Sequence, residues 1–279
     1  MKILSFEQEF TKKTPDRVQI LRFMREAIGV KEVRWKDLTT LNLSKVRKHI
    51  ASKVSGNSPC TYMAILKAFL ADYKDEGIIP CKDPNKELWA RRVPSQNVYL
   101  TEYEISLIDN YEPKNNCEED VKAAFLIECY LGARRSDVLS ITSDNIVDGR
   151  ISYVSKKTHT ECSVPIHNNL MKYLHHKPSK ERDRAVANRV IQRICKEVGI
   201  TGEVRIYYHG ELVKRPKYKF VGSHTARRSF CSNLAKRGVD IYTIASLAGH
   251  SQNIVMTQRY IVPDTEQLSQ EAMSFFNGM

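Results

Sequence analysis

The residue types best suited to chemistry gather near the end of the chain. His224 and Arg227 lie three residues apart, and they are followed by His250 and then by Tyr260. A phenol is a usable nucleophile that leaves a covalent intermediate. A phosphate under attack needs fixed positive charge and hydrogen-bond donors as its transition state develops. These residues therefore predict nucleophilic attack on a phosphodiester, which indicates chemistry on DNA rather than adhesion to it.

The overall charge indicates a polyanionic partner. The 279 residues carry a formal net charge of +12, and the pI is near 9.3. A basic domain of this kind favours nucleic acid as the partner, although a generally basic surface is the alternative that charge alone leaves open. The length is generous for one compact domain and suits two, each able to bury a core.

The spacing of the cysteines and the length of the apolar segments indicate the cellular compartment. The seven cysteines are widely spread and form no C-x-x-C pair of the kind that marks zinc or redox sites. We expect reduced thiols in a cytoplasmic protein. No segment approaches the roughly 20 apolar residues that span a bilayer, so no membrane partner is expected.

Residues 1–97 are predicted to form a helical N-terminal domain. One helix begins at about Pro15, places Ile20, Leu21, Met24 and Ile28 on one stripe and ends at Gly29. A second helix is expected after Ser44, and a third from about residue 61 to 76. Residues 80–97 are rich in proline and charge without a sustained period, as a linker is. Thr101 and Glu104 form a capping box that opens the next domain.

Residues 98–279 are predicted to form a second, mixed domain. An apolar helix covers residues 121–131, and two β-prone runs at 151–154 and 162–166 suit a hairpin that carries Lys156 and Lys157 near its turn. The basic, aromatic segment 205–218 is expected to be a loop or hairpin against the ligand. Three short helices follow, with Tyr242 in the core, and an amphipathic C-terminal helix covers 264–277.

Three short motifs carry a resemblance to a known family. Gly132, Arg134 and Asp137 stand in the run LGARRSDVL, residues 224–230 read HTARRSF, and residues 247–250 read LAGH ahead of Tyr260. In this order the three motifs resemble the conserved boxes of the tyrosine recombinases, the phage-integrase family. The helical N-terminal domain is similar to the family's core-binding domain, so the likeness covers nearly the whole chain.

The resemblance implies a fold and a set of site residues. The fold would be mainly α with a small β-hairpin: a two-domain DNA clamp with a helical core-binding domain and an α+β catalytic domain. Tyr260 would be the nucleophile, Lys157 would protonate the departing 5′ oxygen, and the other members of the set would activate the phosphate. Those members are Arg134, His224, Arg227 and His250. No cofactor or metal is implied, and the resemblance implies a bacterial, nucleoid-associated protein.

Some assignments within this set have alternatives. Lys157 is preferred to Lys156 by counting back seven residues from Val164. Arg227 and Arg228 are consecutive on a predicted helix, so both could lie near His224. The resemblance selects Arg134 and Arg227, and their neighbours Arg135 and Arg228 would otherwise contact the DNA backbone or solvent. The interval from His250 to Tyr260 is one residue longer than usual for the family, but no other tyrosine lies beyond Tyr242. Asp137 would orient Arg134 or cap the local turn.

The sequence thus predicts a site-specific DNA recombinase that works through a 3′-phosphotyrosyl intermediate, for integration or excision of a mobile element. Its partners would be double-stranded DNA and further copies of the chain in a tetrameric synapse, and the C-terminal helix would dock in cis or in trans. Three alternatives compete. They are a type IB topoisomerase, a DNA-binding regulator without activity, and a metal-dependent nuclease using Asp137, Asp144 and Asp148.

Overall fold

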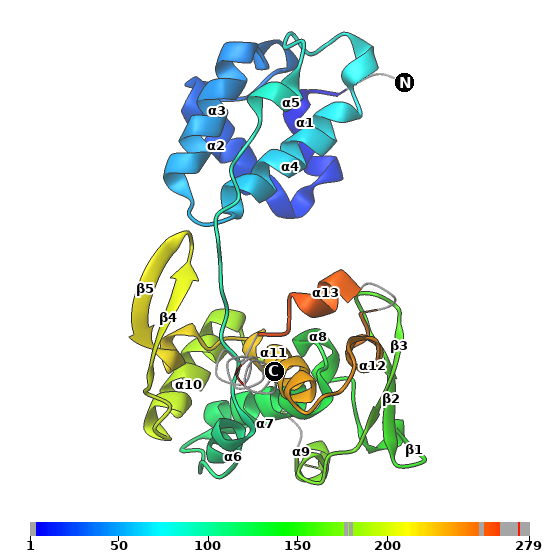
Figure 1. Cartoon of the computed structure of the whole chain (residues 1–279). Coiled ribbons are helices and arrows are strands. Elements are labelled where there is room, and N and C mark those ends of the chain that lie inside the picture. The colour runs from blue at the N-terminus through cyan, green and yellow to red at the C-terminus, as the bar shows by residue number, and fades with distance from the viewer. Residues whose placement is uncertain (1–3, 176–177, 179–180, 251–253, 263–272, 274–279) are drawn as a thin grey trace. The chain divides into compact units, whose positions relative to one another are not determined.

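A computed structural model describes residues 4–175, 178, 181–250, 254–262 and 273. The chain divides into two compact units (Figure 1). The first comprises residues 1–96 together with 206–213, and the second comprises residues 97–205 and 214–279. The predicted C-terminal helix 264–277 falls almost entirely outside the described residues.

The first unit is built from helices joined by short turns. They are α1 (Phe6–Lys13), α2 (Val18–Ile28), α3 (Thr40–Lys53), α4 (Ser58–Ala71) and α5 (Pro84–Glu87), with 3-10 turns at Pro15–Arg17, Trp35–Asp37 and Lys74–Glu76. α2 ends at Gly29, whose φ of 82° is the left-handed conformation that glycine adopts readily. The predicted first helix is therefore confirmed. The second begins five residues earlier than expected, because the Thr39 hydroxyl accepts the Asn42 N–H as an N-cap.

The core of the first unit is apolar and aromatic. Phe6, Phe10 and Phe69 meet edge to face or stacked, with ring centroids 5.0 to 6.0 Å apart. Cys81 and Leu88 are buried in the same core, so the first part of the proline-rich segment 80–97 packs on this unit.

The second unit is built around α7 (Asn116–Leu131), which packs against most of the other helices of this unit. The helices around it are α6 (Glu102–Asp109), α8 (Arg135–Val138), α9 (Leu170–His175), α10 (Arg184–Glu197) and α11 (Thr225–Lys236). The predicted capping box is present, since the Thr101 hydroxyl accepts the Glu104 N–H and Glu104 accepts the Thr101 N–H. Ten residues of α7 are buried, which confirms its expected place in the core.

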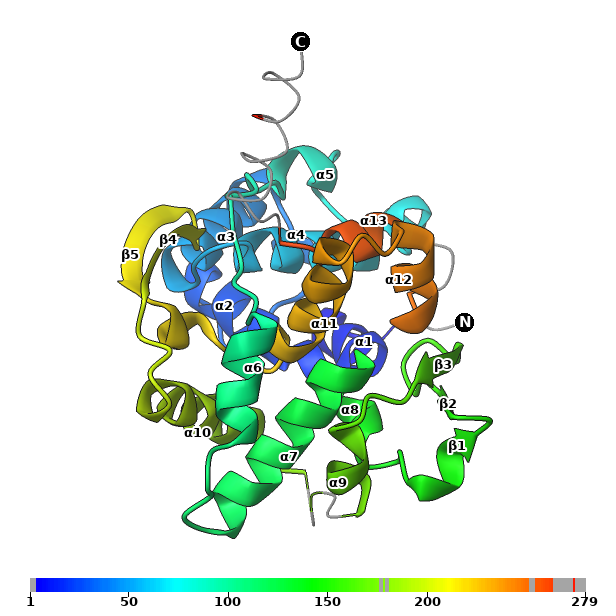
Figure 2. The same cartoon turned by 60° about the horizontal axis from the view of Figure 1, so that its bottom comes forward.

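A small antiparallel sheet lies on the opposite side of α7 from α10 (Figure 2). Its strands are β1 (Ile146–Val147), β2 (Arg150–Val154) and β3 (Glu161–Pro165), in that order. Ile151 pairs with Val164, and Val154 pairs with Glu161. The residues between β2 and β3 form the predicted hairpin connection. The mainly helical fold with small sheets is therefore confirmed.

A second hairpin is formed by β4 (Glu203–Tyr208) and β5 (Glu211–Pro216), followed by a 3-10 turn at Lys217–Phe220. The turn residues His209 and Gly210 have φ angles of 53° and 94°. Two consecutive residues with positive φ suit the right-handed twist of the flanking strands. Of the two forms expected for segment 205–218, a hairpin is the one present.

Two short helices carry the residues up to Tyr260: the LAGH segment begins at the end of the first helix, and Tyr260 follows the second. They are α12 (Ile241–Leu247) and α13 (Ile254–Gln258). Ile244 and Ala245 of α12 are buried, but Tyr242 is 70% exposed, so its predicted place in the core is wrong. Asp240 caps the helix and directs residues 244, 245 and 248 inward, which turns Tyr242 to the opposite face.

Candidate active site

Arg134 is held where α7 ends. Gly132 terminates this helix with a φ of 63°, and a side chain there would overlap the ring of Phe230. The chain then turns sharply into Arg134, the residue ahead of α8. Its Nη1 donates to Ser155 Oγ at 2.7 Å, and its Nη2 donates to the carbonyl oxygen of Gly249 at 3.5 Å. The side chain thus reaches both the β2–β3 hairpin and the LAGH segment.

Asp137 supports this arginine indirectly. It is fully buried, and it accepts hydrogen bonds from Ser155 Oγ and from the backbone N–H of Lys156, both at 3.0 Å. Ser155 therefore accepts from Arg134 and donates to Asp137. The expectation that Asp137 orients Arg134 is met through this hydroxyl. Sequence reasoning missed Ser155, because a serine at the end of a strand carries no signal of its own.

The two candidate lysines lie on the β2–β3 connection. Its backbone is closed by hydrogen bonds from Ser155 N to Thr160 O at 2.9 Å and from His159 N to Ser155 O at 2.8 Å. Both Lys156 and Lys157 are exposed. Lys157 is one of the cations that lower the pKa of His224.

Arg227 ties two helix ends together. It is 1% exposed, its Nη1 donates to the carbonyl oxygen of Gly132 at 2.6 Å, and its Nη2 donates to that of Ala248. Since a guanidinium has five N–H groups, these two bonds leave others for a ligand. Burial lowers the pKa of this group, and the positive charge of Arg134 adds to the effect.

Arg228 lies beside Tyr260, as Arg227 does. Its guanidinium carbon is 5.9 Å from the centroid of the Tyr260 ring, and that of Arg227 is 5.4 Å from it. Two consecutive arginines of α11 therefore lie near one ring, and a contact of Arg228 with the DNA backbone stays a prediction. Arg135 is also engaged within the unit, through the carbonyl oxygen of Arg182 and an ion pair with Glu181 at 3.5 Å.

His250 is buried next to Tyr260. Gly249 precedes it with a φ of 60°, and a side chain at Gly249 would overlap the Sγ of Cys162. The histidine is 5% exposed, and its ring centroid is 4.9 Å from that of Tyr260. Burial, followed by the charges of Arg227 and Arg134, lowers the pKa of His250 to about 3. The imidazole is therefore neutral at physiological pH.

His224 occupies a more open position at the start of α11. Its side chain is exposed, yet partial loss of hydration and the neighbouring cations lower its pKa. The first of these cations is Arg184, at the start of α10, ahead of Arg228, Arg227 and Lys157. Sequence reasoning missed Arg184, because it lies in no family motif.

Tyr260 follows α13 and is half-buried. Four of the six predicted residues form one cluster: Arg134, Arg227, His250 and Tyr260. Arg227 and His250 lie beside the Tyr260 ring, and Arg134 donates to the carbonyl oxygen of Gly249, next to His250. His224 and Lys157 are both exposed. Arg134, Arg227 and Tyr260 each contact the LAGH segment, residues 247–250. The site residues therefore meet at this turn.

Several donors at this site lack a protein partner. Among the buried side-chain nitrogen and oxygen atoms of the described residues, five have no hydrogen-bond partner. Three of them belong to the residues around the Tyr260 ring: Arg227 Nε, Arg228 Nε and His250 Nε2. Buried polar groups are rarely left unpaired, and those that are need an explanation. Unpaired donors on two guanidinium groups and an imidazole suit an anion.

Two further features of the described residues concern metal binding and membrane insertion. In the part of the chain that the structure describes, no three His, Cys, Asp or Glu side chains gather as a metal site requires. No helix among those residues is long and apolar enough to cross a membrane.

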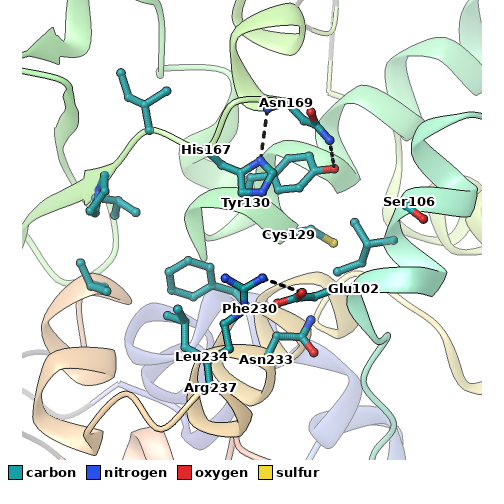
Figure 3. Close-up of a pocket in the computed structure, with 15 residues that line it drawn as sticks. Glu102, Ser106, Cys129, Tyr130, His167, Asn169, Phe230, Asn233, Leu234 and Arg237 are labelled. Atoms are coloured by element: carbon teal, nitrogen blue, oxygen red, sulfur yellow. Dashed lines mark hydrogen bonds and ion pairs between the residues drawn. The ribbon is translucent and has the colours of Figure 1, made fainter.

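The second unit also contains an apolar pocket that Tyr260 does not line (Figure 3). Tyr130 stacks on His167 at 4.4 Å, and Arg237 pairs with Glu102 at 2.6 Å among its lining residues. None of the six predicted site residues lines this pocket.

Comparison with known proteins identifies the family. Residues 99–267 match the phage integrase family. The chain belongs to the phage integrase family. The matched region contains all six residues of the predicted set.

One curated relative of this integrase-family chain is a protein of Pseudomonas phage Pf1 that is assigned as an integrase. The two are 28% identical over 150 residues, which is 51% of this chain and 38% of the phage protein. The matched region thus spans well under half the length of that relative.

Solved structures share the fold at low sequence identity. The integrase of transposon Tn1549 bound to transposon right-end DNA has a TM-score of 0.63 and 13% identity, covering 98% of this chain and 100% of that one. A lambda integrase tetramer bound to a Holliday junction gives 0.62 and 15%, covering 93% and 78%. The XerH recombinase in a post-cleavage complex gives 0.60 and 14%, covering 90% and 75%. The chain therefore has the tyrosine recombinase fold.

Proposed function

We propose that the chain is a site-specific DNA recombinase in which Tyr260 is the nucleophile. The phenol oxygen attacks a backbone phosphate, the bond from phosphorus to the 5′ oxygen breaks, and a 3′-phosphotyrosyl link and a free 5′ hydroxyl result. The 5′ hydroxyl of a partner strand then reverses the step. Because the phosphodiester bond energy is retained in the protein link, the reaction needs no nucleotide, and we expect no metal ion or cofactor.

The observation that carries this proposal is the set of unpaired donors around one phenol. Arg227 and Arg228 each place a guanidinium within 6 Å of the Tyr260 ring, and His250 lies 4.9 Å from it. All three retain a buried nitrogen without a partner. A scissile phosphate next to the phenol would satisfy such donors. A protein that only binds DNA has no need of a phenol at that point.

Each residue of the set has a role in keeping with its surroundings. Arg134 and Arg227 would hold the non-bridging oxygens, for which planar and permanently charged guanidinium groups are suited. Neutral His250 would donate a hydrogen bond to a phosphoryl oxygen, and exposed His224 would assist proton transfer. Lys157 would protonate the departing 5′ oxygen. Its position on an exposed turn allows it to reach a bound strand.

The first unit offers a basic groove for duplex DNA. Trp89 is 54% exposed, and the guanidinium carbon of Arg47 lies 4.5 Å from the centroid of its ring. Lys48, Lys53 and Arg91 line the same groove. Guanidinium and ammonium groups at a groove supply the phosphate contacts that position a protein on DNA. We propose that residues 1–97, with their linker at about 80–97, act as the core-binding domain and that residues 98–279 carry out catalysis.

We also propose that copies of the chain associate on DNA as a tetrameric synapse. Strand exchange needs two duplexes and therefore more than one active site. The lambda integrase structure is described as a tetramer bound to a Holliday junction, and the Tn1549 integrase structure is a complex with transposon right-end DNA. Integration or excision of a mobile element is accordingly the role that we propose.

Covalent trapping tests the chemistry. Wild type and Tyr260→Phe are incubated with nicked duplex fragments from the ends of the element that encodes the chain, with a chelator present. We expect a denaturation-resistant protein–DNA adduct with wild type and none with the variant. A nuclease that depended on Asp137, Asp144 and Asp148 would instead give metal-dependent cleavage without an adduct.

A second measurement separates the remaining alternatives. Supercoiled DNA without a partner strand would be relaxed by a topoisomerase, whereas a recombinase would join strands between two marked duplexes. Salt-sensitive binding without any adduct would favour a regulator and contradict the proposal.

A further inference from the structure

Ser232 contacts the backbone on both sides of Ile261, next to Tyr260. Its hydroxyl accepts the Val262 N–H at 2.9 Å and donates to the carbonyl oxygen of Tyr260 at 3.3 Å. The serine is 3% exposed and lies on α11, four residues after Arg228. The helix that supplies two arginines to the phenol therefore also anchors the chain that carries it.

This arrangement is unusual for a helical serine. A serine within a helix commonly donates to the carbonyl oxygen four residues earlier, as Ser229 does to Thr225 at 2.8 Å. Ser232 instead uses both its donor and its acceptor on the tyrosine segment. In the described structure this segment is otherwise tied by its own turn, in which Tyr260 N donates to Thr257 O at 2.8 Å. Ser232 thus provides a tertiary restraint on the backbone of Tyr260.

We infer that Ser232 is a positioning residue for the nucleophile. Its two hydrogen bonds fix the backbone of Tyr260 relative to α11, so that the phenol stays aligned with the guanidinium groups of Arg227 and Arg228. This inference rests on the proposed function, because it assigns a role to Ser232 only if Tyr260 attacks the phosphate.

The expected size of the effect follows from the demands of in-line attack. The reacting atoms must be held at near-contact distance, and a misplacement of about 1 Å can lower a rate by about 100-fold. Losing the two bonds leaves both the Tyr260 carbonyl and the Val262 N–H without their serine partner. We therefore expect about a 10-fold to 100-fold loss in the rate of the cleavage step. DNA affinity should not change, because Ser232 is buried beneath the chain and away from solvent.

The experiment measures single-turnover cleavage of a nicked suicide substrate at saturating DNA, together with the affinity for DNA. The Ser232 variants are Ser232→Ala, Ser232→Cys, which keeps the volume with a weaker donor and acceptor, and Ser232→Thr, which keeps the hydroxyl. Ser229→Ala is the matched control, since Ser229 is equally buried on the same helix but bonds to Thr225 and to Leu100 N at 2.8 Å. Wild type and Tyr260→Phe define full and zero adduct formation.

We expect cleavage rates in the order serine, threonine, cysteine and alanine at position 232, with DNA affinity within about twofold of wild type throughout. Ser229→Ala should cleave within about threefold of wild type. The inference is overturned if Ser232→Ala and Ser232→Cys cleave as fast as Ser229→Ala, or if their loss lies entirely in DNA affinity. Should the alanine variant fail to fold, the cysteine and threonine variants decide. Absence of an adduct with wild type would instead reject the proposed function itself.

Discussion

The Nδ1 atom of His250 lies 3.0 Å from the hydroxyl oxygen of Thr257, and both side chains are buried. This contact joins the LAGH segment to α13, three residues before Tyr260. A threonine hydroxyl can donate to Nδ1 of a neutral imidazole, and the ring proton then resides on Nε2. Nε2 is the nitrogen without a protein partner. With the hydroxyl as the donor, Nε2 carries the ring proton and can donate to a phosphate oxygen.

Replacement of Thr257 tests this tautomer. Thr257→Val keeps the shape and removes the hydroxyl, so we expect single-turnover cleavage to fall about 100-fold, the lower end of the cost of losing one aligned hydrogen-bond donor. Thr257→Ser retains the hydroxyl and should cleave within about threefold of wild type. Equal rates for the valine and serine variants would show that the hydroxyl does not matter.

The pKa of His250 predicts a pH-dependent stability. The folded-state pKa is about 3 and the ordinary value is 6.5. Between these values the unfolded chain binds a proton that the folded chain does not, so the free energy of unfolding falls as the pH decreases below 6.5. The loss amounts to about 1.4 kcal/mol for each pH unit within this window, and above it His250 contributes no pH dependence.

Chemical denaturation of wild type and His250→Gln across this range measures the effect. Groups common to both proteins cancel in the difference between their unfolding free energies, so the remaining slope belongs to His250. We expect wild type to lose stability more steeply as the solution is acidified. Parallel curves would mean that the imidazole gains a proton without penalty in the folded state.

Lys157 can be distinguished from Lys156 by the leaving group. Without its general acid the enzyme must expel an unprotonated alkoxide, so Lys157→Ala should cleave about 100-fold more slowly. A substrate with sulfur in place of the bridging 5′ oxygen leaves as a thiolate, which needs no proton. That substrate should restore the rate of Lys157→Ala and have little effect on Lys156→Ala. Rescue of the Lys156 variant alone would reverse the assignment.

Gly249 is expected to tolerate no side chain. Its φ of 60° is left-handed, and an added Cβ would overlap Cys162 Sγ. Gly249→Ala should destabilise the fold by about 2–4 kcal/mol, through overpacking and backbone strain together. Gly199→Ala is the matched control. That glycine has a φ of 86° but open space around it, so it should lose only about 1 kcal/mol.

Shortening Cys162 should relieve part of this cost. In the double variant Cys162→Ala with Gly249→Ala the overlap is removed while the backbone strain remains. Urea unfolding should therefore show less destabilisation than the sum of the two single changes. Strict additivity would mean that the two residues do not meet.

Asp137 is expected to stabilise the hairpin that carries the lysines. Asp137→Ala leaves Ser155 Oγ and Lys156 N without their buried acceptor, which should cost about 2–3 kcal/mol of unfolding free energy. Asp144→Ala is the control, because Asp144 is exposed on the turn ahead of β1. Cleavage should fall with Asp137→Ala and persist with Asp144→Ala. Loss of activity in both variants, restored by a divalent metal, would favour the nuclease alternative.

Much of the local structure was predictable from the order of residues. Apolar spacing, a capping box and glycine stops indicated α2, α6 and α7, because these signals act within one or two helical turns. The β2–β3 hairpin followed from two β-prone runs and a polar connection. Tyr242 was misplaced, since the direction in which a short helix faces depends on its N-cap and on the core that it meets. The predicted domain boundary and the roles of the six site residues remain predictions.

The sequence by itself determined which residue types were available for phosphate chemistry and in what order, because short motifs specify their own chemistry. Only the tertiary structure decided how they meet. Arg134 reaches the Gly249 carbonyl across 115 positions of the chain, and Ser155 links that arginine to Asp137. Arg184, Ser232 and Thr257 join the site through packing between helices. No local pattern encodes such contacts, because a hydroxyl or guanidinium gains its partner only when distant segments are brought together around a common core.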